Sequence, residues 1–271
     1  MRVLFIGDVV GKPGRIVLAG LLPSLKIDLN ADFVIINCEN ASSGKGLTIK
    51  SMEELFSLGI DGMTSGNHIW NKRDIYETLS SDTRIIRPQN MPVSCPGQGY
   101  TVIEGNNAKR LGLINLLGRV FMPPIDCPFM AADYVLDNFF KDNIPVLVDF
   151  HAEATSEKTA MSRYLDGRVS ALVGTHTHVQ TSDETILPGG TAYITDVGMT
   201  GGHGGIIGNT TESVLPKYLT GMPSKFDVCD ECLRINAVLV DIDDESSRAV
   251  DIKRINQAFS VNLISRRNTE I

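Results

Sequence analysis

The sequence predicts an α/β fold in which most strands pair in parallel. Short apolar runs rich in Val, Ile and Leu recur along the 271 residues. Amphipathic stretches lie between several of these runs, and polar residues follow most of them. Alternation of strands with helices is typical of sheets whose parallel strands are joined by crossover helices.

Seven runs are predicted to be strands, over residues 2–7, 33–38, 61–66, 110–117, 145–150, 170–175 and 191–197. The amphipathic stretches predict helices over residues 14–29, 49–57, 72–80, 129–141 and 156–165. The C-terminal part differs, because residues 235–244 and 248–255 alternate and are joined by the short turn ESS, which predicts an antiparallel hairpin. No linker is evident, so we expect a single domain over residues 1–271.

The composition excludes several classes of protein. A hydrophobic content of 42% with 21% charged residues is that of an ordinary globular protein. No run approaches the roughly 18 apolar residues of a membrane span. A net charge of -7 without long basic runs argues against stable nucleic-acid binding. The five scattered cysteines fit a reducing compartment, so the expected location is the cytoplasm.

Polar residues with metal-binding or acid–base chemistry follow five of the predicted strands. Ligands of α/β sheets bind at the carboxyl ends of the strands, so these residues are expected to share one rim. In chain order they are Asp8, Glu39, Asn40, Asn67, His68, His151, His176 and His178.

The closely spaced pair His176 and His178 is the strongest single signal. In an extended chain, residues i and i+2 point the same way, so both imidazoles can face one spot. Two ordinary loop histidines are the alternative, but the polar residues after the other strands favour a metal that accepts nitrogen and oxygen ligands. Six candidate ligands exceed the four that one tetrahedral ion needs and suit a pair of ions. They are Asp8, Glu39, Asn67, His151, His176 and His178.

Five motifs in chain order resemble those of the calcineurin-like metallophosphoesterases. They are GDVVG (7–11), NCEN (37–40), GNHIW (66–70), DFHAEATSEK (149–158) and GTHTH (174–178). The YmdB-type branch, phosphodiesterases that act on 2′,3′-cyclic nucleotides, is the most similar, and PPIDCPF (123–129) and TAYITDVGMTGG (191–202) also resemble it. Two departures from the general superfamily fit this branch. Val10 replaces the usual histidine after Asp8, and Glu39 replaces an aspartate.

The resemblance implies two packed mixed β-sheets flanked by helices, and two transition-metal ions per chain. Iron is the expected metal, with manganese or zinc as alternatives. One ion would be held by Asp8, Glu39 and His178, and the other by Glu39, Asn67, His151 and His176. Asn40 would bind a phosphate oxygen of the substrate, and His68 would face the substrate.

The expected function is hydrolysis of a small cyclic nucleotide or other phosphodiester, with a hydroxide held by the ions as nucleophile and His68 as general acid. A phosphomonoesterase or protein phosphatase with the same metal centre is the first alternative. A regulator that binds metal and nucleotide without turnover is the second, although it would not need His68. A homo-oligomer is left open.

Other motifs carry weaker expectations. Residues 7–14 lack the spacing of a phosphate-binding Walker loop. The glycine-rich segment 199–208 is expected to be a mobile loop near the site, with its His203 outside the metal set. Cys229 and Cys232 are expected to lie in a turn as two thiols. Glu153 and Lys158 either support His151 or simply begin a helix.

Overall fold

The computed structural model describes residues 1–105, 108–140 and 144–260, which form two mixed sheets. In the first sheet β1, β3 and β4 are parallel, whereas β12 is antiparallel to β1 and pairs with β11 and β13. β2 pairs in parallel with β11. The strands are β1 (Arg2–Ile6), β2 (Asp8–Val9), β3 (Phe33–Asn37), β4 (Gly62–Thr64), β11 (Met199–Gly202), β12 (Leu233–Ile242) and β13 (Ala249–Ala258).

The second sheet has the order β5-β6-β7-β8-β10-β9. Its four inner strands are parallel, and β5 and β9 pair antiparallel at the two edges. The strands are β5 (Tyr100–Glu104), β6 (Arg110–Leu117), β7 (Val146–His151), β8 (Ala171–Thr175), β9 (Thr185–Ile186) and β10 (Ala192–Ile194).

The two sheets pack face to face. The strands carry apolar side chains on both faces, one facing the other sheet and one facing the helices. In β1, Val3 and Phe5 point between the sheets, where they join Leu113 of β6 in one buried cluster. Leu4 and Ile6 point the other way, into the cluster under the helices. Strands buried on both faces are the reason why these runs are almost continuously apolar.

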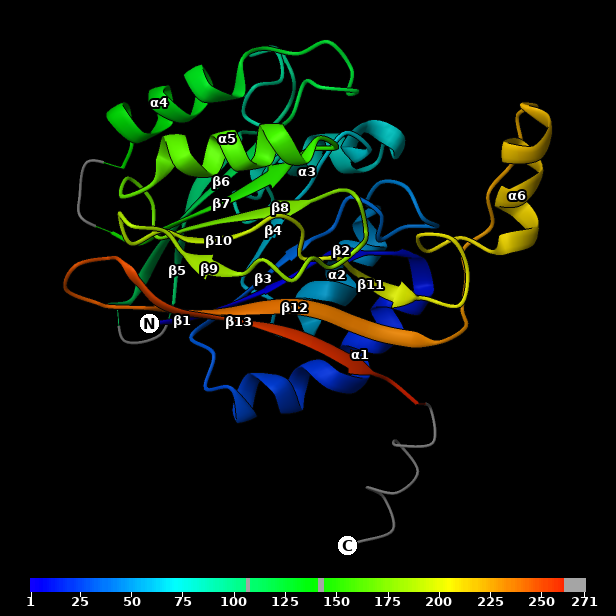
Figure 1. Cartoon of the computed structure of the whole chain (residues 1–271), viewed down its shortest axis with the longest axis horizontal. Helices are drawn as coiled ribbons and strands as arrows, with labels where there is room; N and C mark the ends of the chain where they lie inside the picture. The colour runs from blue at the N-terminus through cyan, green and yellow to red at the C-terminus, as the bar shows by residue number, and fades with distance from the viewer. Residues whose placement is uncertain (106–107, 141–143, 261–271) are drawn as a thin grey trace, which may run out of the picture.

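Helices cover the outer faces of both sheets (Figure 1). The side chains of α1 and α2 share a core with the first sheet, and those of α4 and α5 share one with the second. The helices are α1 (Gly11–Asp28), α2 (Ile49–Ser57), the 3₁₀ helix η1 (Ile69–Asn71), α3 (Ile75–Ser81), α4 (Pro128–Asn138), α5 (Thr155–Leu165) and α6 (Thr211–Thr220). The structure therefore confirms the predicted α/β fold of two packed mixed sheets flanked by helices.

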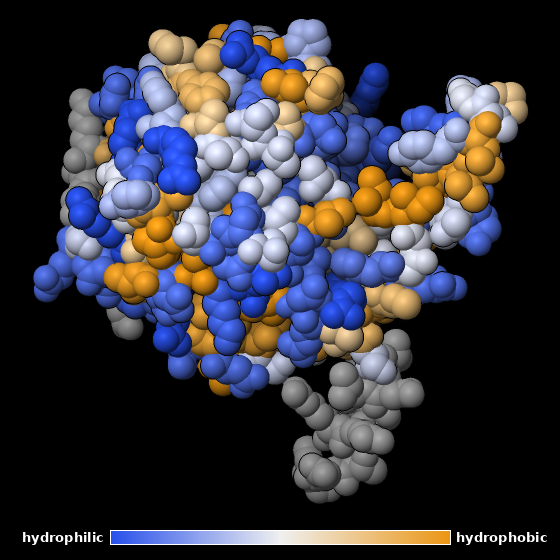
Figure 2. Space-filling model, viewed as in Figure 1, coloured by the Kyte–Doolittle hydropathy of each residue, from blue (hydrophilic) through white to orange (hydrophobic). Residues whose placement is uncertain are grey.

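The helix α6 projects away from the rest of the molecule (Figure 1). Figure 2 shows hydrophobic side chains along this arm. Leu215, Tyr218, Leu219 and Met222 are exposed on it or just after it. A homo-oligomer stays a prediction. The single domain over residues 1–271 also stays a prediction, and its expected end lies outside the described ranges.

The expectation of a mobile glycine-rich loop is wrong for its first half. Met199–Gly202 is the buried strand β11, which pairs with β2 and β12. A Cβ atom on Gly202 would lie 2.1 Å from the carbonyl oxygen of Cys229, so glycine is needed for close approach of two chain segments. Cys229 is buried and Cys232 exposed, and both are free thiols, as expected.

Three shorter features also bear on the predictions. The helix expected over 72–80 starts only at Ile75, after the 3₁₀ turn η1. The C-terminal hairpin is confirmed, with β12 and β13 paired from Arg234↔Ala258 to Ile242↔Ala249. None of the helices in the described residues combines the length and apolar character needed to cross a bilayer.

Candidate metal centre

The predicted site residues lie where strands of both sheets end. In the first sheet Asp8 begins β2 just after β1, Glu39 follows β3, and Asn67 and His68 follow β4. In the second sheet His151 ends β7, and His176 and His178 follow β8. The sheets are linked directly behind the site, because Asn37 Nδ2 donates to Asp149 Oδ2 over 2.9 Å. The predicted rim is therefore made by two sheets rather than by one.

One imidazole nitrogen, Nε2 of His151, is the meeting point of three other polar side chains. It lies 3.2 Å from Asn67 Oδ1, 3.0 Å from His176 Nδ1 and 3.2 Å from Glu39 Oε2. Ligand atoms of Glu39, His151 and His176 all lie within 4.8 Å of one another. A single ring nitrogen cannot satisfy three such neighbours with one hydrogen bond.

The other nitrogen of the same ring identifies its tautomer. Thr175 Oγ1 donates to Asp149 Oδ1 over 2.7 Å and so accepts from His151 Nδ1 over 2.8 Å. In the neutral ring this leaves the Nε2 lone pair facing the oxygens of Glu39 and Asn67. A metal ion binds where lone pairs converge, and a histidine ligand is usually oriented by a hydrogen bond from its other ring nitrogen. The cluster therefore fits a transition-metal ion.

A second group of ligand atoms lies beside the first. Asp8 is fully buried, and its Oδ1 has no hydrogen-bond partner among the described residues. This oxygen lies 3.9 Å from His178 Nε2 and 3.9 Å from His151 Nδ1. An ionised oxygen without a partner is costly to bury, so Asp8 also fits a cation site.

The pair His176 and His178 does not adopt the extended backbone that was predicted. Both residues have positive φ angles, of 100° and 65°, so the chain turns sharply between them. As a result the two rings do not face one spot. His176 Nδ1 faces His151, whereas His178 Nε2 lies 3.0 Å from Asn40 Nδ2. The two imidazoles therefore belong to different groups of polar side chains.

His68 and Asn40 contact each other, and both lie against Oε1 of the buried Glu39. Nδ1 of His68 lies 2.9 Å from Asn40 Oδ1 and 3.2 Å from Glu39 Oε1. The Asn40 amide is buried and also donates to Glu39 Oε1 over 3.1 Å. Its binding of a phosphate oxygen stays a prediction. Residues 67 and 68 lie in a turn rather than in the extended chain that was expected. Asn67 Oδ1 lies beside His151 Nε2, whereas His68 Nδ1 lies beside Asn40 and Glu39.

Glu153 and Lys158, which follow His151 in the chain, have roles that the sequence left open. Glu153 Oε2 lies 3.1 Å from His176 Nε2, so it can orient the ring of His176 rather than that of His151. Lys158 is buried and pairs with Asp196 over 2.8 Å. His203 makes a hydrogen bond from Nε2 to the Met199 carbonyl and lies outside the metal-ligand group, as expected.

Residues 4–255 match the family described as YmdB-like protein. The chain belongs to the YmdB-like family. It is 49% identical over 255 residues to a Bacillus subtilis protein named 2′,3′-cyclic-nucleotide 2′-phosphodiesterase, covering 94% of this chain and 96% of that one. This confirms the predicted family and the prediction of a hydrolase.

Two solved structures are also similar to this YmdB-like chain. A hypothetical protein from Thermus thermophilus superposes with a TM-score of 0.90 at 43% identity, covering 96% of this chain and 100% of that one. A protein described as a novel phosphatase from Mycoplasma pneumoniae superposes with a TM-score of 0.89 at 34% identity, covering 98% and 96%. This chain thus shares its overall fold with both proteins.

The charges of the YmdB-like site favour a cation among the histidines. Burial opposes a charge on His151, but Glu39 and Asp8 outweigh it and raise the pKa of His151 to about 9. Burial and the neighbouring His151 lower the pKa of His176 to about 3. Burial would raise the pKa of Glu39, but His151 and His68 hold it well below its usual value. Burial raises the pKa of Asp8.

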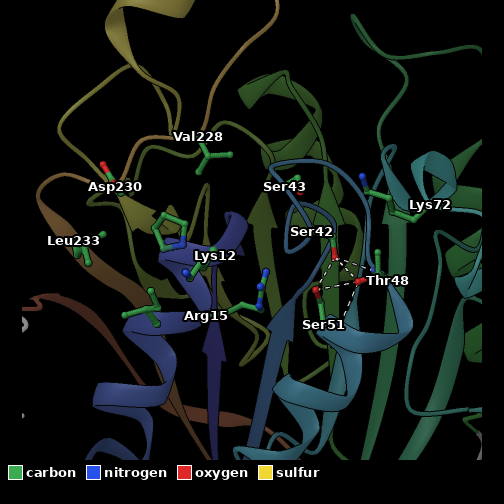
Figure 3. A pocket seen from close by; sticks show the side chains of 12 residues that line it. Lys12, Arg15, Ser42, Ser43, Thr48, Ser51, Lys72, Val228, Asp230 and Leu233 are labelled. Atoms are coloured by element: carbon green, nitrogen blue, oxygen red, sulfur yellow. Dashed lines mark hydrogen bonds between the residues drawn. The ribbon is translucent and has the colours of Figure 1, made fainter.

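The cavity with the largest volume among those described is bordered by the loop that follows Glu39 and Asn40. It measures about 520 Å³, and none of the predicted site residues lines it. Ser42, on its wall, is hydrogen-bonded to Thr48 and Ser51 at the start of α2 (Figure 3). Arg15 donates to the Ala41 carbonyl from α1. These contacts fix the loop to two helices and thereby hold Glu39 and Asn40 in place.

Sequence reasoning missed Asp149 and Thr175. Thr175 is hydrogen-bonded to Nδ1 of His151, and Asp149 accepts a hydrogen bond from Thr175. Both are buried, and Thr64 Oγ1 and Asn37 Nδ2 also donate to the Asp149 carboxylate. Burial raises the pKa of Asp149 to about 6 despite these bonds. An acid within an otherwise apolar run, PVLVDF, was the available signal.

Gly66 was also missed, and it leads to a prediction. A Cβ atom there would lie 2.3 Å from Glu39 Oε2 and 2.4 Å from His151 Nε2. Gly66→Ala is therefore expected to displace these ligands and weaken metal binding by about 10–100-fold, the range for disturbed ligand orientation. Chelator competition would measure the affinity.

Gly62→Ala is the matched control in the same chain segment. The atoms nearest to its Cβ would belong to the Ile103 and Ile35 side chains, at 3.1 and 3.2 Å. It should change stability more than metal affinity. Equal metal affinity in Gly66→Ala and the unsubstituted protein would show that no ion binds beside Gly66.

Proposed function

We propose that this YmdB-like chain hydrolyses 2′,3′-cyclic nucleotides with two bound transition-metal ions. The carrying observation is the convergence of Glu39, His151 and His176 beside the unpartnered oxygen of Asp8. The 49% identity to the Bacillus subtilis phosphodiesterase supports the substrate class. By similarity to the name of that relative, the bond broken is the phosphorus–O2′ ester.

The residues would divide between two ions. Asn67, His151 and His176 would hold one ion, and Asp8 and His178 the other, with Glu39 between them. Iron is the metal we favour, with manganese or zinc as alternatives, because mixed nitrogen and oxygen ligands do not select one of them strongly. When bound, such ions supply Lewis-acid charge to phosphoryl oxygens and make water acidic at neutral pH.

Side chains around the proposed ions would orient the metal ligands, bind the substrate and supply a proton. Thr175 keeps the His151 ring in one tautomer, and Glu153 orients the ring of His176. Asn40 holds Nδ1 of His68, which leaves Nε2 of His68 available to give a proton to the leaving ribose oxygen. Asn40 itself would contact a phosphate oxygen.

The metal content of the purified chain tests the proposal. We expect close to two transition-metal ions per chain by elemental analysis, and loss of activity when a chelator removes them. One ion per chain after growth with added metal would contradict the dinuclear centre.

A substrate panel tests the reaction. We expect turnover of 2′,3′-cyclic nucleotides to exceed that of nucleoside monophosphates and phosphopeptides. The Mycoplasma pneumoniae relative described as a phosphatase makes the monoester activity a real alternative. Faster monoester than cyclic diester hydrolysis would favour it, and nucleotide binding without any product would favour a regulator.

A further inference from the structure

The turn between the two site histidines is an energetically unfavourable piece of backbone. His176 and His178 both have positive φ angles, in the left-handed region that side-chain-bearing residues rarely adopt. Such backbone persists only where the surrounding structure holds it. Thr177, between them, is therefore the place to look for what holds the turn.

Thr177 is held by one carboxylate oxygen. Its backbone N and its Oγ1 both donate to Asp196 Oδ2, over 3.1 and 2.8 Å. The other oxygen, Oδ1, accepts from the backbone N of Gly198 over 2.8 Å. Asp196 follows β10, so the carboxylate ties the histidine turn to the neighbouring strand.

Lys158 of α5 provides the opposite charge. Its Nζ lies 2.8 Å from the same Oδ2, and the two side chains are 0% and 1% exposed. A Cβ atom on Gly174 of β8 would lie 3.0 Å from Lys158 Cδ, so the lysine reaches Asp196 directly against β8. A carboxylate buried this deeply would be costly without its partner.

We propose that the Lys158–Asp196 pair is a positioning device that holds Thr177 and thereby spreads His176 and His178 toward two different metal sites. The inference rests on the proposed function, since it takes both histidines as ligands. His176 then faces His151, and His178 faces Asn40 and Asp8. Neither Lys158 nor Asp196 contacts the substrate in this role.

The test is the affinity of the whole metal-depleted chain for Mn²⁺. Thr177→Val keeps the side-chain shape and removes the hydroxyl donor. We expect its Mn²⁺ affinity to fall about 10–100-fold, as for other groups that orient metal ligands. Thr177→Ser keeps the hydroxyl and should bind as the unsubstituted chain does.

Thr181→Val is the matched control for stability. Thr181 also bonds to Asp196, but only to its backbone N and O, over 2.9 and 3.2 Å, and it lies outside the histidine turn. It should match Thr177→Val in the midpoint of metal-free thermal unfolding while keeping its Mn²⁺ affinity. Equal loss of affinity in both variants would overturn the inference.

A double variant tests the charge pair itself. Lys158→Met with Asp196→Asn removes both charges at similar volume, so neither partner is left buried and unpaired. We expect a folded chain whose Mn²⁺ affinity falls at least as far as that of Thr177→Val. Unchanged affinity would overturn the role of the pair. If the unsubstituted chain bound none of Mn²⁺, Fe²⁺ and Zn²⁺, the proposed function would fail as well, whereas unchanged variants alone would defeat only this inference.

Discussion

Glu39→Gln is expected to abolish turnover and to deplete both metal sites. The Glu39 carboxylate lies between the two groups of ligands, with Oε2 at 3.2 Å from His151 Nε2 and Oε1 facing Asn40 and His68. Its loss would remove the negative charge between the two proposed cations. A bound metal ion stabilises the transition state by several kcal/mol, and about 1.4 kcal/mol corresponds to a factor of ten in rate. The rate should therefore fall at least about 10³-fold.

His178→Ala is the comparison for this variant. His178 lies beside Asp8 and Asn40 but not in the His151 cluster, so its loss should deplete chiefly one ion. Elemental analysis of both variants, with circular dichroism to show folding, makes the measurement. Two ions and most of the activity in Glu39→Gln would show that this carboxylate does not bridge.

His68→Ala is expected to keep both ions and the fold while turnover falls by about 10²–10⁴-fold, the usual contribution of a general acid. Within the His151 cluster the His68 ring contacts Glu39, with Nδ1 at 3.2 Å from Oε1, and the His68 side chain is 26% exposed. Nδ1 is held by Asn40, and Nε2 makes no hydrogen bond within the part of the chain that the structure describes. The ring is thus placed to give a proton to a substrate.

The leaving group distinguishes this role from a structural one. A ribose oxygen leaves poorly unless protonated, whereas a nitrophenolate needs no proton. The defect of His68→Ala should therefore shrink on a nitrophenyl phosphodiester. Loss of an ion in this variant, or an equal defect on both substrates, would refute the general acid.

Strands that are buried on both faces could be predicted, because each appears in the sequence as a short continuous run of apolar residues. The short strands β2, β9 and β11 could not, since they have two to four residues each and form by pairing with distant segments, as Met199 does with Asp8. The helix α6 was missed because its exposed apolar side chains belong to no core that the sequence reveals.

The sequence by itself determined which polar residues end the strands, and so which residues are candidates for the site. Only the tertiary structure decided how they are grouped. Two sheets bring Glu39 and His151 together from segments more than 100 residues apart, and a left-handed turn separates His176 from His178. The turn could not be predicted from the sequence, because local backbone preference alone favours an extended chain. Its backbone is held by hydrogen bonds to Asp196, and these form only when the chain has folded.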